Sequence, residues 1–296
     1  MSAELLGVRL FVAGLRAASA AAGRLPRQTY AEPICRVVGA VWYLSRPDSR
    51  AAVRDNLCHV LGRPPSRALV ASVFRHGALN YWDTLVMPHF TYEELAALVD
   101  LHGIELLDRA RQAGRGVICA GAHLGSVALV AQILPGLGYP VTGVIEQFEP
   151  AEVFDFFSEQ RQVLGTRLLP AGPAAAREML LALRRNEVVG LVTDRDVAGT
   201  GPIIPFFDAP TRFPEGVAWL AARTGAPILI AIAVRKAGGR FDAFFEPLPE
   251  VERTGNRKQD IVRVTQAVAE RLQYYVANHP EQWTVFQRRW PEVPTG

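Results

Sequence analysis

Apolar and polar positions follow two different patterns along this chain. Up to about residue 100 the apolar positions recur at helical spacing, which predicts helices. From about residue 101, short apolar runs alternate with amphipathic stretches, which predicts strands separated by helices. The expected helices of the first part span residues 30–44, 50–61, 66–88 and 92–99. The expected strands of the second part span residues 116–120, 141–145, 167–169, 188–193, 228–234 and 240–247, and the expected helices 126–134, 151–164, 174–185, 215–223 and 258–277.

This alternation predicts the fold class: α/β, with a mainly parallel central sheet covered by helices and an all-helical N-terminal region. We expect residues 1–100 to form the helical region and residues 101–296 to form the α/β region. The chain has 296 residues, of which 49% are hydrophobic, so it can bury a sizeable core.

The N-terminal residues 1–24 place apolar and basic side chains on different faces of a helix. The apolar face holds Leu5, Leu6, Val8, Phe11, Val12 and Leu15, and the basic residues are Arg9, Arg16 and Arg24. Such a helix either lies on an anionic membrane surface or packs against a core. It fits a signal peptide poorly, because arginines interrupt the apolar stretch.

Residues 116–145 carry no charged side chain and are numerous enough to span a membrane. Glycines and prolines interrupt this stretch, however, including Gly121, Gly125, Pro135 and Pro140. They divide it into a strand, a helix and a second strand, so we expect a buried part of the sheet here.

Composition excludes some classes of function. The net charge is +3, and arginine supplies 30 of the 32 basic residues. These arginines are spread along the chain without a basic tract, which argues against nucleic-acid binding. Cys35, Cys58 and Cys119 lie in apolar segments without metal-binding spacing, so we expect reduced core cysteines and no metal.

Polar side chains follow three of the expected strands. His123 follows the first strand, Glu146 follows the second, and Asp194, Arg195 and Asp196 follow the strand over residues 188–193. The carboxyl ends of parallel strands meet at one edge of a sheet, where ligands bind in such folds. We therefore expect these side chains to share one functional site.

Several short motifs, in order along the chain, extend this interpretation. They are Arg54-Asp55-Asn56-Leu57, Ala113-Gly114-Arg115-Gly116-Val117, His123-Leu124-Gly125, Glu146, Arg161, Asp194-Arg195-Asp196, Pro205-Phe206-Phe207, Pro214-Glu215-Gly216, His279-Pro280-Glu281-Gln282-Trp283 and Arg288-Arg289-Trp290. Through them the chain resembles the lipid A biosynthesis acyltransferases and their actinobacterial relatives that acylate phosphatidylinositol mannosides, within the lysophospholipid acyltransferase superfamily.

The resemblance implies a membrane-associated O-acyltransferase on the cytoplasmic face of the cell membrane, peripheral or monotopic. Its partners would be an anionic membrane surface, an acyl-CoA or acyl carrier protein as thioester donor, and a glycolipid or phospholipid acceptor, with no cofactor. His123 would be the catalytic base, with Glu146 and Asp194 as the catalytic acids to test. Arg161, Arg195 and Asp196 would bind substrate. The guanidinium of an arginine can bind a phosphate through two hydrogen bonds.

The chain departs from the family motif at one position. The motif places an aspartate or glutamate five positions after the histidine, and Ala128 stands there. Either Glu146, Asp194 or Asp196 replaces that acid, or the chain is a weakened or catalytically silent lipid-binding member. The sequence favours the second interpretation, because the turn that exposes His123 also places residue 128 on the same side. A serine mechanism at Ser126 is disfavoured: the chain lacks a G-x-S-x-G motif, and Ser126 fits a helix cap better.

Overall fold

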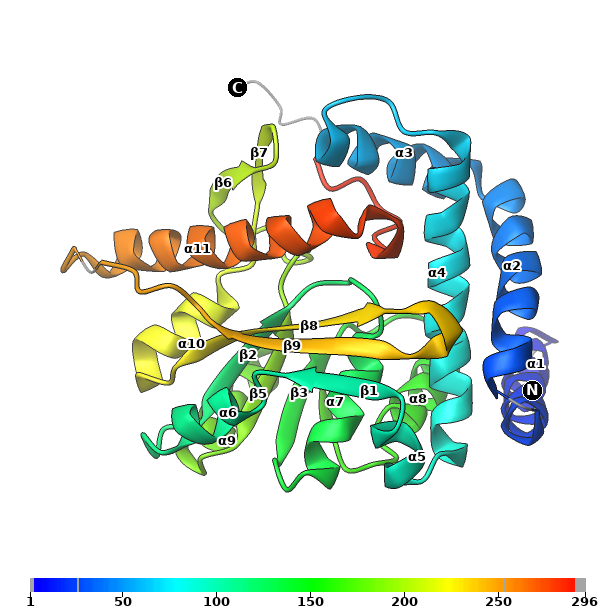
Figure 1. Ribbon diagram of the computed structural model, residues 1–296, viewed down its shortest axis with the longest axis horizontal. Coiled ribbons are helices and arrows are strands. Elements are labelled where there is room, and N and C mark those ends of the chain that lie inside the picture. The colour runs from blue at the N-terminus through cyan, green and yellow to red at the C-terminus, as the bar shows by residue number, and fades with distance from the viewer. Residues whose placement is uncertain (1–2, 26, 253, 291–296) are drawn as a thin grey trace.

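The computed structural model describes residues 3–25, 27–252 and 254–290 and forms an α/β fold around a seven-stranded sheet (Figure 1). Its strand order is β1-β9-β8-β2-β5-β3-β4, and β6 and β7 form a separate hairpin. The strands are β1 (Val99–His102), β2 (Val117–Gly121), β3 (Val141–Ile145), β4 (Arg167–Pro170), β5 (Val188–Val192), β6 (Ile203–Phe206), β7 (Ala209–Arg212), β8 (Ile228–Arg235) and β9 (Phe241–Pro247).

The sheet is mainly parallel, as the sequence predicts. Strand β2 pairs in parallel with β5 and β8, and β3 pairs in parallel with β4 and β5. The exception is the hairpin of β8 and β9, which are antiparallel, and β1 then runs parallel to β9. The carboxyl ends of β2, β5 and β3 therefore lie next to one another.

Helices cover both faces of this sheet. They are α1 (Ala3–Arg24), α2 (Arg27–Ser45), α3 (Pro47–Leu61), α4 (Arg67–Val86), α5 (Tyr92–Ala96), α6 (Glu105–Arg111), α7 (Val127–Gly136), α8 (Ala151–Gln160), α9 (Pro173–Arg184), α10 (Gly216–Thr224) and α11 (Arg257–Asn278). Figure 1 shows α11 crossing one face of the sheet and α4 standing along one side, with α1 and α2 outside it. The helical N-terminal region thus exists as predicted.

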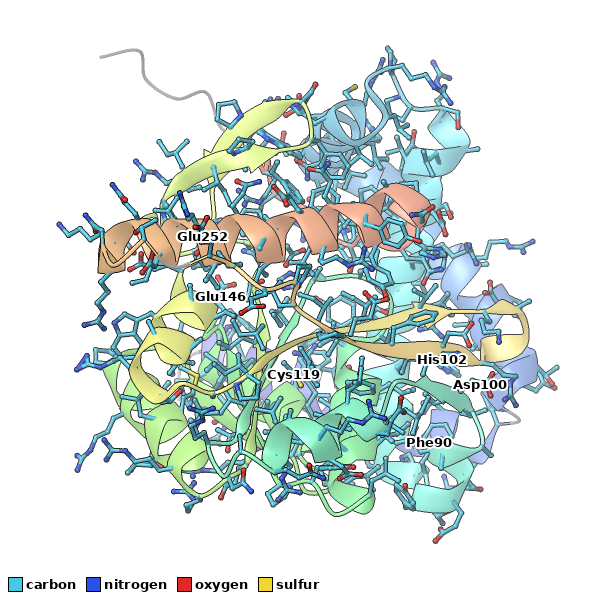
Figure 2. The ribbon with its side chains drawn as sticks, turned by 60° about the vertical axis from the view of Figure 1, so that its left-hand side comes forward. Phe90, Asp100, His102, Cys119, Glu146 and Glu252 are labelled. Atoms are coloured by element: carbon cyan, nitrogen blue, oxygen red, sulfur yellow. The ribbon has the colours of Figure 1, made fainter. Side chains whose placement is uncertain are left out.

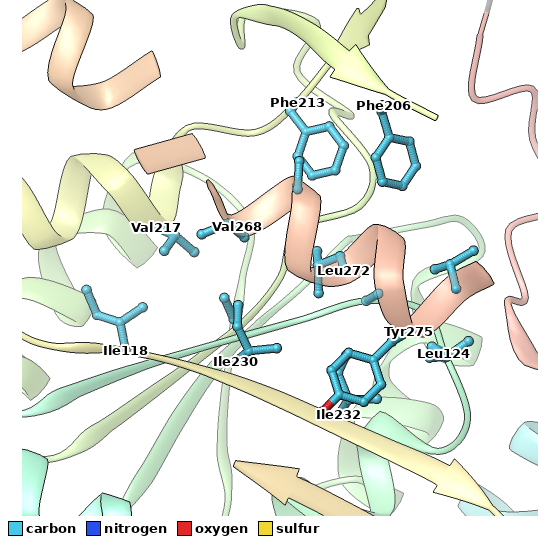
Figure 3. Close-up of a cluster of buried hydrophobic side chains, with 14 of the residues drawn as sticks. Ile118, Leu124, Phe206, Phe213, Val217, Ile230, Ile232, Val268, Leu272 and Tyr275 are labelled. Atoms are coloured by element: carbon cyan, nitrogen blue, oxygen red, sulfur yellow. The ribbon is translucent and has the colours of Figure 1, made fainter. Parts of the chain in front are cut away.

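Alternate residues of the central strand β2 face two different cores, because successive side chains of a strand point to opposite faces. Ile118 and Ala120 join a core with α9, α10 and α11, part of which is drawn in Figure 3. Val117 and Cys119 join the other core, with α6 and α7. Phe206 is fully buried in the first core, as expected of a packing residue rather than a ligand contact.

Some elements differ from the sequence prediction. The expected helix over residues 92–99 ends at Ala96 and is followed by β1, and the pattern does not predict α6 or the β6–β7 hairpin. Strand β1 has only four residues, and its pairing partner β9 lies far away in the sequence. Such a short edge strand is defined by its tertiary pairing, which local periodicity does not contain.

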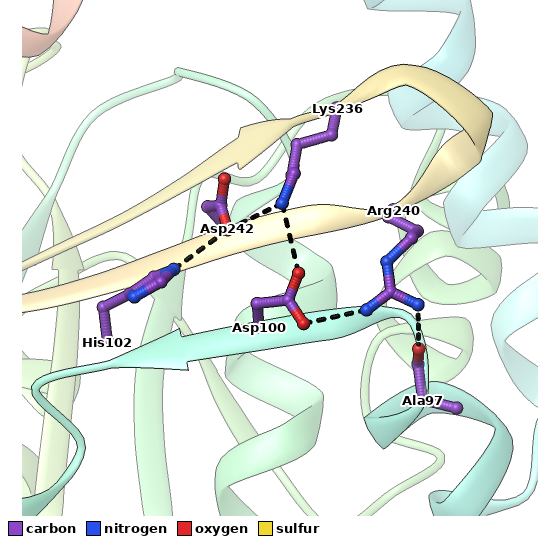
Figure 4. A network of polar contacts seen from close by, with 6 residues as sticks. All are labelled: Ala97, Asp100, His102, Lys236, Arg240 and Asp242. Atoms are coloured by element: carbon purple, nitrogen blue, oxygen red, sulfur yellow. Dashed lines mark hydrogen bonds and ion pairs between the residues drawn. The ribbon is translucent and has the colours of Figure 1, made fainter.

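Polar side chains hold β1 against β9 (Figure 4). Lys236 donates hydrogen bonds to Asp100 at 3.1 Å and to Asp242 at 3.2 Å, and Arg240 donates to Asp100 at 2.8 Å. The Nε2 of His102 lies 2.9 Å from Asp242 Oδ1. The hydrogen bonds from Lys236 and Arg240 lower the pKa of Asp100. This network protects the edge of the sheet with charge.

The amphipathic N-terminal helix α1 packs against the protein with part of its apolar face. Val8, Val12 and Leu15 contact the buried aromatic cluster of α8, and Arg16 pairs with Glu159 of α8 at 3.0 Å. Of the two expectations for this helix, packing against a core therefore holds for Val8, Val12 and Leu15. Their burial against α8 is a tertiary contact that helical periodicity leaves open.

The remaining apolar residues of α1 point outward. Leu5, Leu6, Leu10 and Phe11 are exposed. By length and composition alone, the segment Leu5–Arg24 could cross a membrane, a test that some core helices and signal sequences also pass. By contrast, residues 116–145 form β2, α7 and β3, which confirms that this stretch belongs to the sheet.

Candidate active site

Three neighbouring strands bring the predicted site residues together at one edge of the sheet. Gly121 at the end of β2 pairs with Val192 at the end of β5, and His123 and Asp194 each follow two residues later. Strand β3 lies on the other side of β5, and Glu146 follows it directly. The strand order therefore places Asp194 between the other two positions.

His123 contacts Asp194 through two hydrogen bonds. The imidazole Nδ1 lies 2.7 Å from Asp194 Oδ1, and the backbone N–H of His123 donates to Asp194 Oδ2 at 3.0 Å. A carboxylate at Nδ1 fixes the tautomer with a proton on Nδ1 and a free lone pair on Nε2. The side chain of His123 is 37% exposed, so this base is accessible from outside.

Asp194 remains ionised although it is completely buried. Burial by itself would raise its pKa, but the charge of His123 and hydrogen bonds from His123 and Trp283 outweigh this effect and lower the pKa from 3.8 to about 2. A buried carboxylate is stable only when its oxygens accept such hydrogen bonds. The acid thus presents a permanent negative charge to the imidazole at neutral pH.

Of the two interpretations of Ala128, this geometry supports the replacement of the missing acid by Asp194. Asp194 contacts the imidazole, so His123 has an acid partner although Ala128 stands at the motif position. The side chain of Ala128 itself lies outside the described residues. Local reasoning about the turn could not reveal the contact, because β2 and β5 are joined only by the pairing of the sheet.

Trp283 is a site residue that the sequence reasoning did not single out for chemistry. Its indole N–H donates to Asp194 Oδ2 at 2.7 Å, the same oxygen that accepts the backbone N–H of His123. The next residue, Thr284, donates its backbone N–H to the carbonyl of His123 at 2.8 Å. The only sequence signal was the His279–Trp283 motif, which gives no role for the indole.

Gly125 allows the histidine loop to pass close to β8. Its φ is +60°, and a Cβ placed there would lie 1.7 Å from the carbonyl oxygen of Ala233. Its N–H donates to the carbonyl of Gln282 at 3.1 Å. The loop therefore requires glycine for both its left-handed backbone and its close approach.

The segment that carries Trp283 is held by α3. The side-chain amide of Asn56 donates to the carbonyls of Val285 and Gln287 at 3.1 and 2.9 Å, and its oxygen accepts the N–H of Arg289 at 2.8 Å. Asn56 is buried. The motif containing Asn56 thus connects the helical region to the C-terminal segment behind the site.

The other acids do not contact His123. Glu146 forms an ion pair with Arg195 at 3.3 Å, and Asp196 Oδ2 accepts the N–H of Gly201 at 2.8 Å within the following turn. Glu146 is half-exposed and is labelled in Figure 2. Among the three candidate acids, only Asp194 has the position of an orienting carboxylate, while Glu146 orients Arg195.

Arg161 lies at the C-terminal end of α8, away from carboxylates. Among the described residues no carboxylate forms an ion pair with it, and its Nε is buried without a hydrogen-bond partner. Burial lowers the pKa of this guanidinium. The side chain of Gln132 donates to its backbone carbonyl. A guanidinium in this state can still accept an anionic partner.

The remaining nucleophile candidates are unsuited to catalysis. Ser126 is buried and makes no capping hydrogen bond at the start of α7, so the prediction of a side-chain cap is wrong. Cys35 and Cys119 are buried, and burial raises the pKa of the Cys119 thiol, which lies in β2 (Figure 2), to about 12. In the described part of the chain, no group of His, Cys, Asp and Glu residues could hold a metal ion.

Known proteins are similar to this chain over most of its length. The pattern of the bacterial lipid A biosynthesis acyltransferase family matches residues 7–292. The phosphatidylinositol mannoside acyltransferase of Mycobacterium tuberculosis is 32% identical over 84% of this chain and 79% of its own length. The protein of the same name from Mycolicibacterium smegmatis is 30% identical over 84% of this chain and 82% of its own. The lipid A biosynthesis palmitoleoyltransferase of Escherichia coli is 23% identical over 86% and 82%.

A histidine and a buried carboxylate at the carboxyl end of an α/β sheet, together with these matches, define an acyltransferase. The chain belongs to the family of bacterial lipid A biosynthesis acyltransferases.

Proposed function

We propose that this protein transfers a fatty acyl group from a thioester donor, acyl-CoA or acyl carrier protein, to a hydroxyl of a glycolipid of the phosphatidylinositol mannoside type. The observation that carries the proposal is the hydrogen bond between His123 and Asp194 in a chain of this family. Support for the acceptor class comes from the names of the relatives that share 30–32% identity with it. The proposed chemistry needs neither a metal nor a cofactor.

His123 acts as the general base in this proposal. Its Nε2 removes the proton of the acceptor hydroxyl while that oxygen attacks the thioester carbonyl. The tetrahedral intermediate then collapses, the carbon–sulfur bond breaks, and the thiolate takes the proton from the imidazolium. Asp194 holds the imidazole in the required tautomer and stabilises its positive charge throughout. The products are the acylated lipid and the free thiol.

Arg195 and Arg161 serve substrate binding in the proposal. Glu146 holds Arg195 in place next to Asp194, which brings a guanidinium to the same edge of the sheet as the base. Arg161 has a guanidinium without a described carboxylate partner, which suits the phosphate of a donor or of a lipid headgroup. Asp196 supports the turn that follows Arg195 through its hydrogen bond to Gly201.

We place the protein on the cytoplasmic face of the cell membrane, as a peripheral or monotopic enzyme. The support is the exposure of Leu6, Leu10 and Phe11 on α1, which is unusual for side chains that meet water. Arg16 forms an ion pair with Glu159 of α8 at 3.0 Å.

Acyl transfer by the purified chain tests the proposed function. The wild type and His123→Ala are incubated with radiolabelled acyl-CoA or acyl carrier protein and a phosphatidylinositol mannoside. The labelled lipid should form with the wild type and not with His123→Ala. Equal rates for both proteins would refute the base, and no transfer by either would favour a silent lipid-binding member. Lipid profiles of cells without the gene should then lack one acylated species, which identifies the acceptor.

A further inference from the structure

A pocket lies at the corner where α2 ends and α3 and α4 begin. Its volume is about 560 Å³, and its lining includes Arg50, Arg54 and Arg67 together with Tyr43 and Leu44. The pocket is separate from the catalytic base. Asn80 contacts the segment next to His123, and it lies thirteen residues after Arg67 on α4, which corresponds to roughly 20 Å along the helix.

The three arginines of this pocket carry uncompensated charge. Among the described residues none of them forms an ion pair, and no acidic side chain lines the pocket. Arg50 is held by the carbonyl of Tyr43 at 2.8 Å and lies over the Tyr43 ring. Arg50 and Arg54 repel each other at helical i,i+4 spacing, and Arg67 begins α4, where the helix dipole is positive. A bound anion would offset both unfavourable interactions.

An exposed apolar surface adjoins the same pocket. On the outer face of α2, Val37, Val41 and Leu44 are 65%, 60% and 71% exposed. Leu44 belongs both to this face and to the pocket lining, so the apolar surface leads directly to the arginines. A phospholipid combines the two complementary parts, an anionic headgroup and apolar chains.

We propose that this corner binds the phosphodiester headgroup of an anionic membrane phospholipid, while the outer face of α2 contacts the acyl chains. The proposal rests on the membrane location proposed above and assigns the recognition of anionic lipid to α2, α3 and α4. An acidic carrier protein would also meet the arginines, but its acyl chain is transferred at His123, so it leaves Val37 and Val41 without an apolar partner. The continuity of the two surfaces therefore favours a lipid.

Co-sedimentation with vesicles tests this proposal on the full chain. The vesicles consist of phosphatidylcholine, with or without phosphatidylglycerol. Arg54→Gln combined with Arg67→Gln should weaken partitioning to the phosphatidylglycerol vesicles by roughly tenfold or more and leave binding to neutral vesicles unchanged. The matched control is Arg257→Gln with Lys258→Gln, which removes the same charge from exposed positions at the start of α11 and should have no effect.

A second pair of substitutions separates apolar from charged contacts. Val41→Ser with Leu44→Ser should weaken binding to both kinds of vesicle, because it removes contact with the acyl chains. Melting curves check that each variant is folded. We expect them to be folded, because the replaced side chains are exposed.

Three results would overturn the proposal. The first is equal weakening by the pocket and control variants, which would indicate diffuse charge. The second is unchanged binding of the pocket variant to phosphatidylglycerol vesicles. The third is a pocket variant that no longer binds coenzyme A or carrier protein but still binds vesicles, which would make the pocket a binding site for the acyl donor. His123→Ala should bind vesicles like the wild type. Vesicle binding therefore tests the lipid site, and the transfer assay tests the proposed catalytic function independently.

Discussion

Replacing Asp194 by asparagine removes one charge from the site and preserves the shape of the side chain. Asp194 accepts three hydrogen bonds: one from the imidazole at Oδ1, and two at Oδ2 from the His123 backbone N–H and the Trp283 indole. Asparagine has one carbonyl oxygen for these three donors. The variant must therefore choose which of its two sides accepts.

The choice favours the wrong tautomer of the histidine. If the amide NH₂ faced the two N–H groups at the Oδ2 position, both donors would be buried without acceptors, at a cost of about 1–3 kcal/mol each. The carbonyl therefore takes the Oδ2 position, and the NH₂ faces the imidazole Nδ1. His123 must then accept a hydrogen bond at Nδ1 and carry its proton on Nε2. A protonated Nε2 cannot remove the proton of the acceptor hydroxyl.

We expect Asp194→Asn to lower kcat by about two to four orders of magnitude, the range of general base catalysis. The corresponding replacement in the serine-protease triad costs about four orders of magnitude. KM should change little, because Asp194 is completely buried and contacts the base rather than the substrate. The assay is the initial rate of transfer from radiolabelled donor at saturating acceptor, with the fold checked by circular dichroism.

A second aspartate–histidine pair provides the matched control. On the surface, His59 Nδ1 lies 2.6 Å from Asp208 Oδ1, so Asp208→Asn makes the same chemical change without altering the pair of His123 and Asp194. This control should keep the wild-type rate. An unchanged kcat in Asp194→Asn, with the protein folded, would refute the role of Asp194 as the orienting acid.

Three further variants and one titration test the remaining arguments. Ala128→Glu should leave the wild-type rate nearly unchanged, because the base is already oriented, but should raise the rate in the Asp194→Asn background; a strong gain in the wild type would contradict this. Folding lowers the pKa of Asp194 from 3.8 to about 2, so ionised Asp194 stabilises the fold by about 2 kcal/mol above pH 4, and this contribution is lost toward pH 2. In urea titrations, the unfolding free energy of Asp194→Asn should therefore depend less on pH between 4 and 2 than that of the wild type. Gly125→Ala should destabilise the fold by about 2 kcal/mol or more in urea, because its Cβ meets the Ala233 carbonyl; wild-type stability would contradict that clash. Asn56→Ala should lower the unfolding free energy by about 2–4 kcal/mol, since three buried hydrogen bonds are lost. An unchanged melting temperature would show that these hydrogen bonds are dispensable.

Apolar periodicity predicts most of the helices and strands, together with the polar side chains that follow the strands. The expected strand over residues 141–145 coincides with β3, and the expected helix over 258–277 differs from α11 by one residue at each end. These predictions succeed because apolar periodicity and the surrounding glycines and prolines are local properties of the chain. The same locality placed His123, Glu146 and Asp194 at the ends of strands.

Which of these acids contacts the histidine depends on the pairing of distant strands. Asp194 lies 71 positions from His123 in the sequence and reaches it because β2 pairs with β5, while Glu146 follows β3 and meets Arg195 instead. Trp283 completes the site from the far end of the chain. Strand order and helix docking depend on contacts between distant segments, and the periodicity of one segment does not identify the segment with which it pairs.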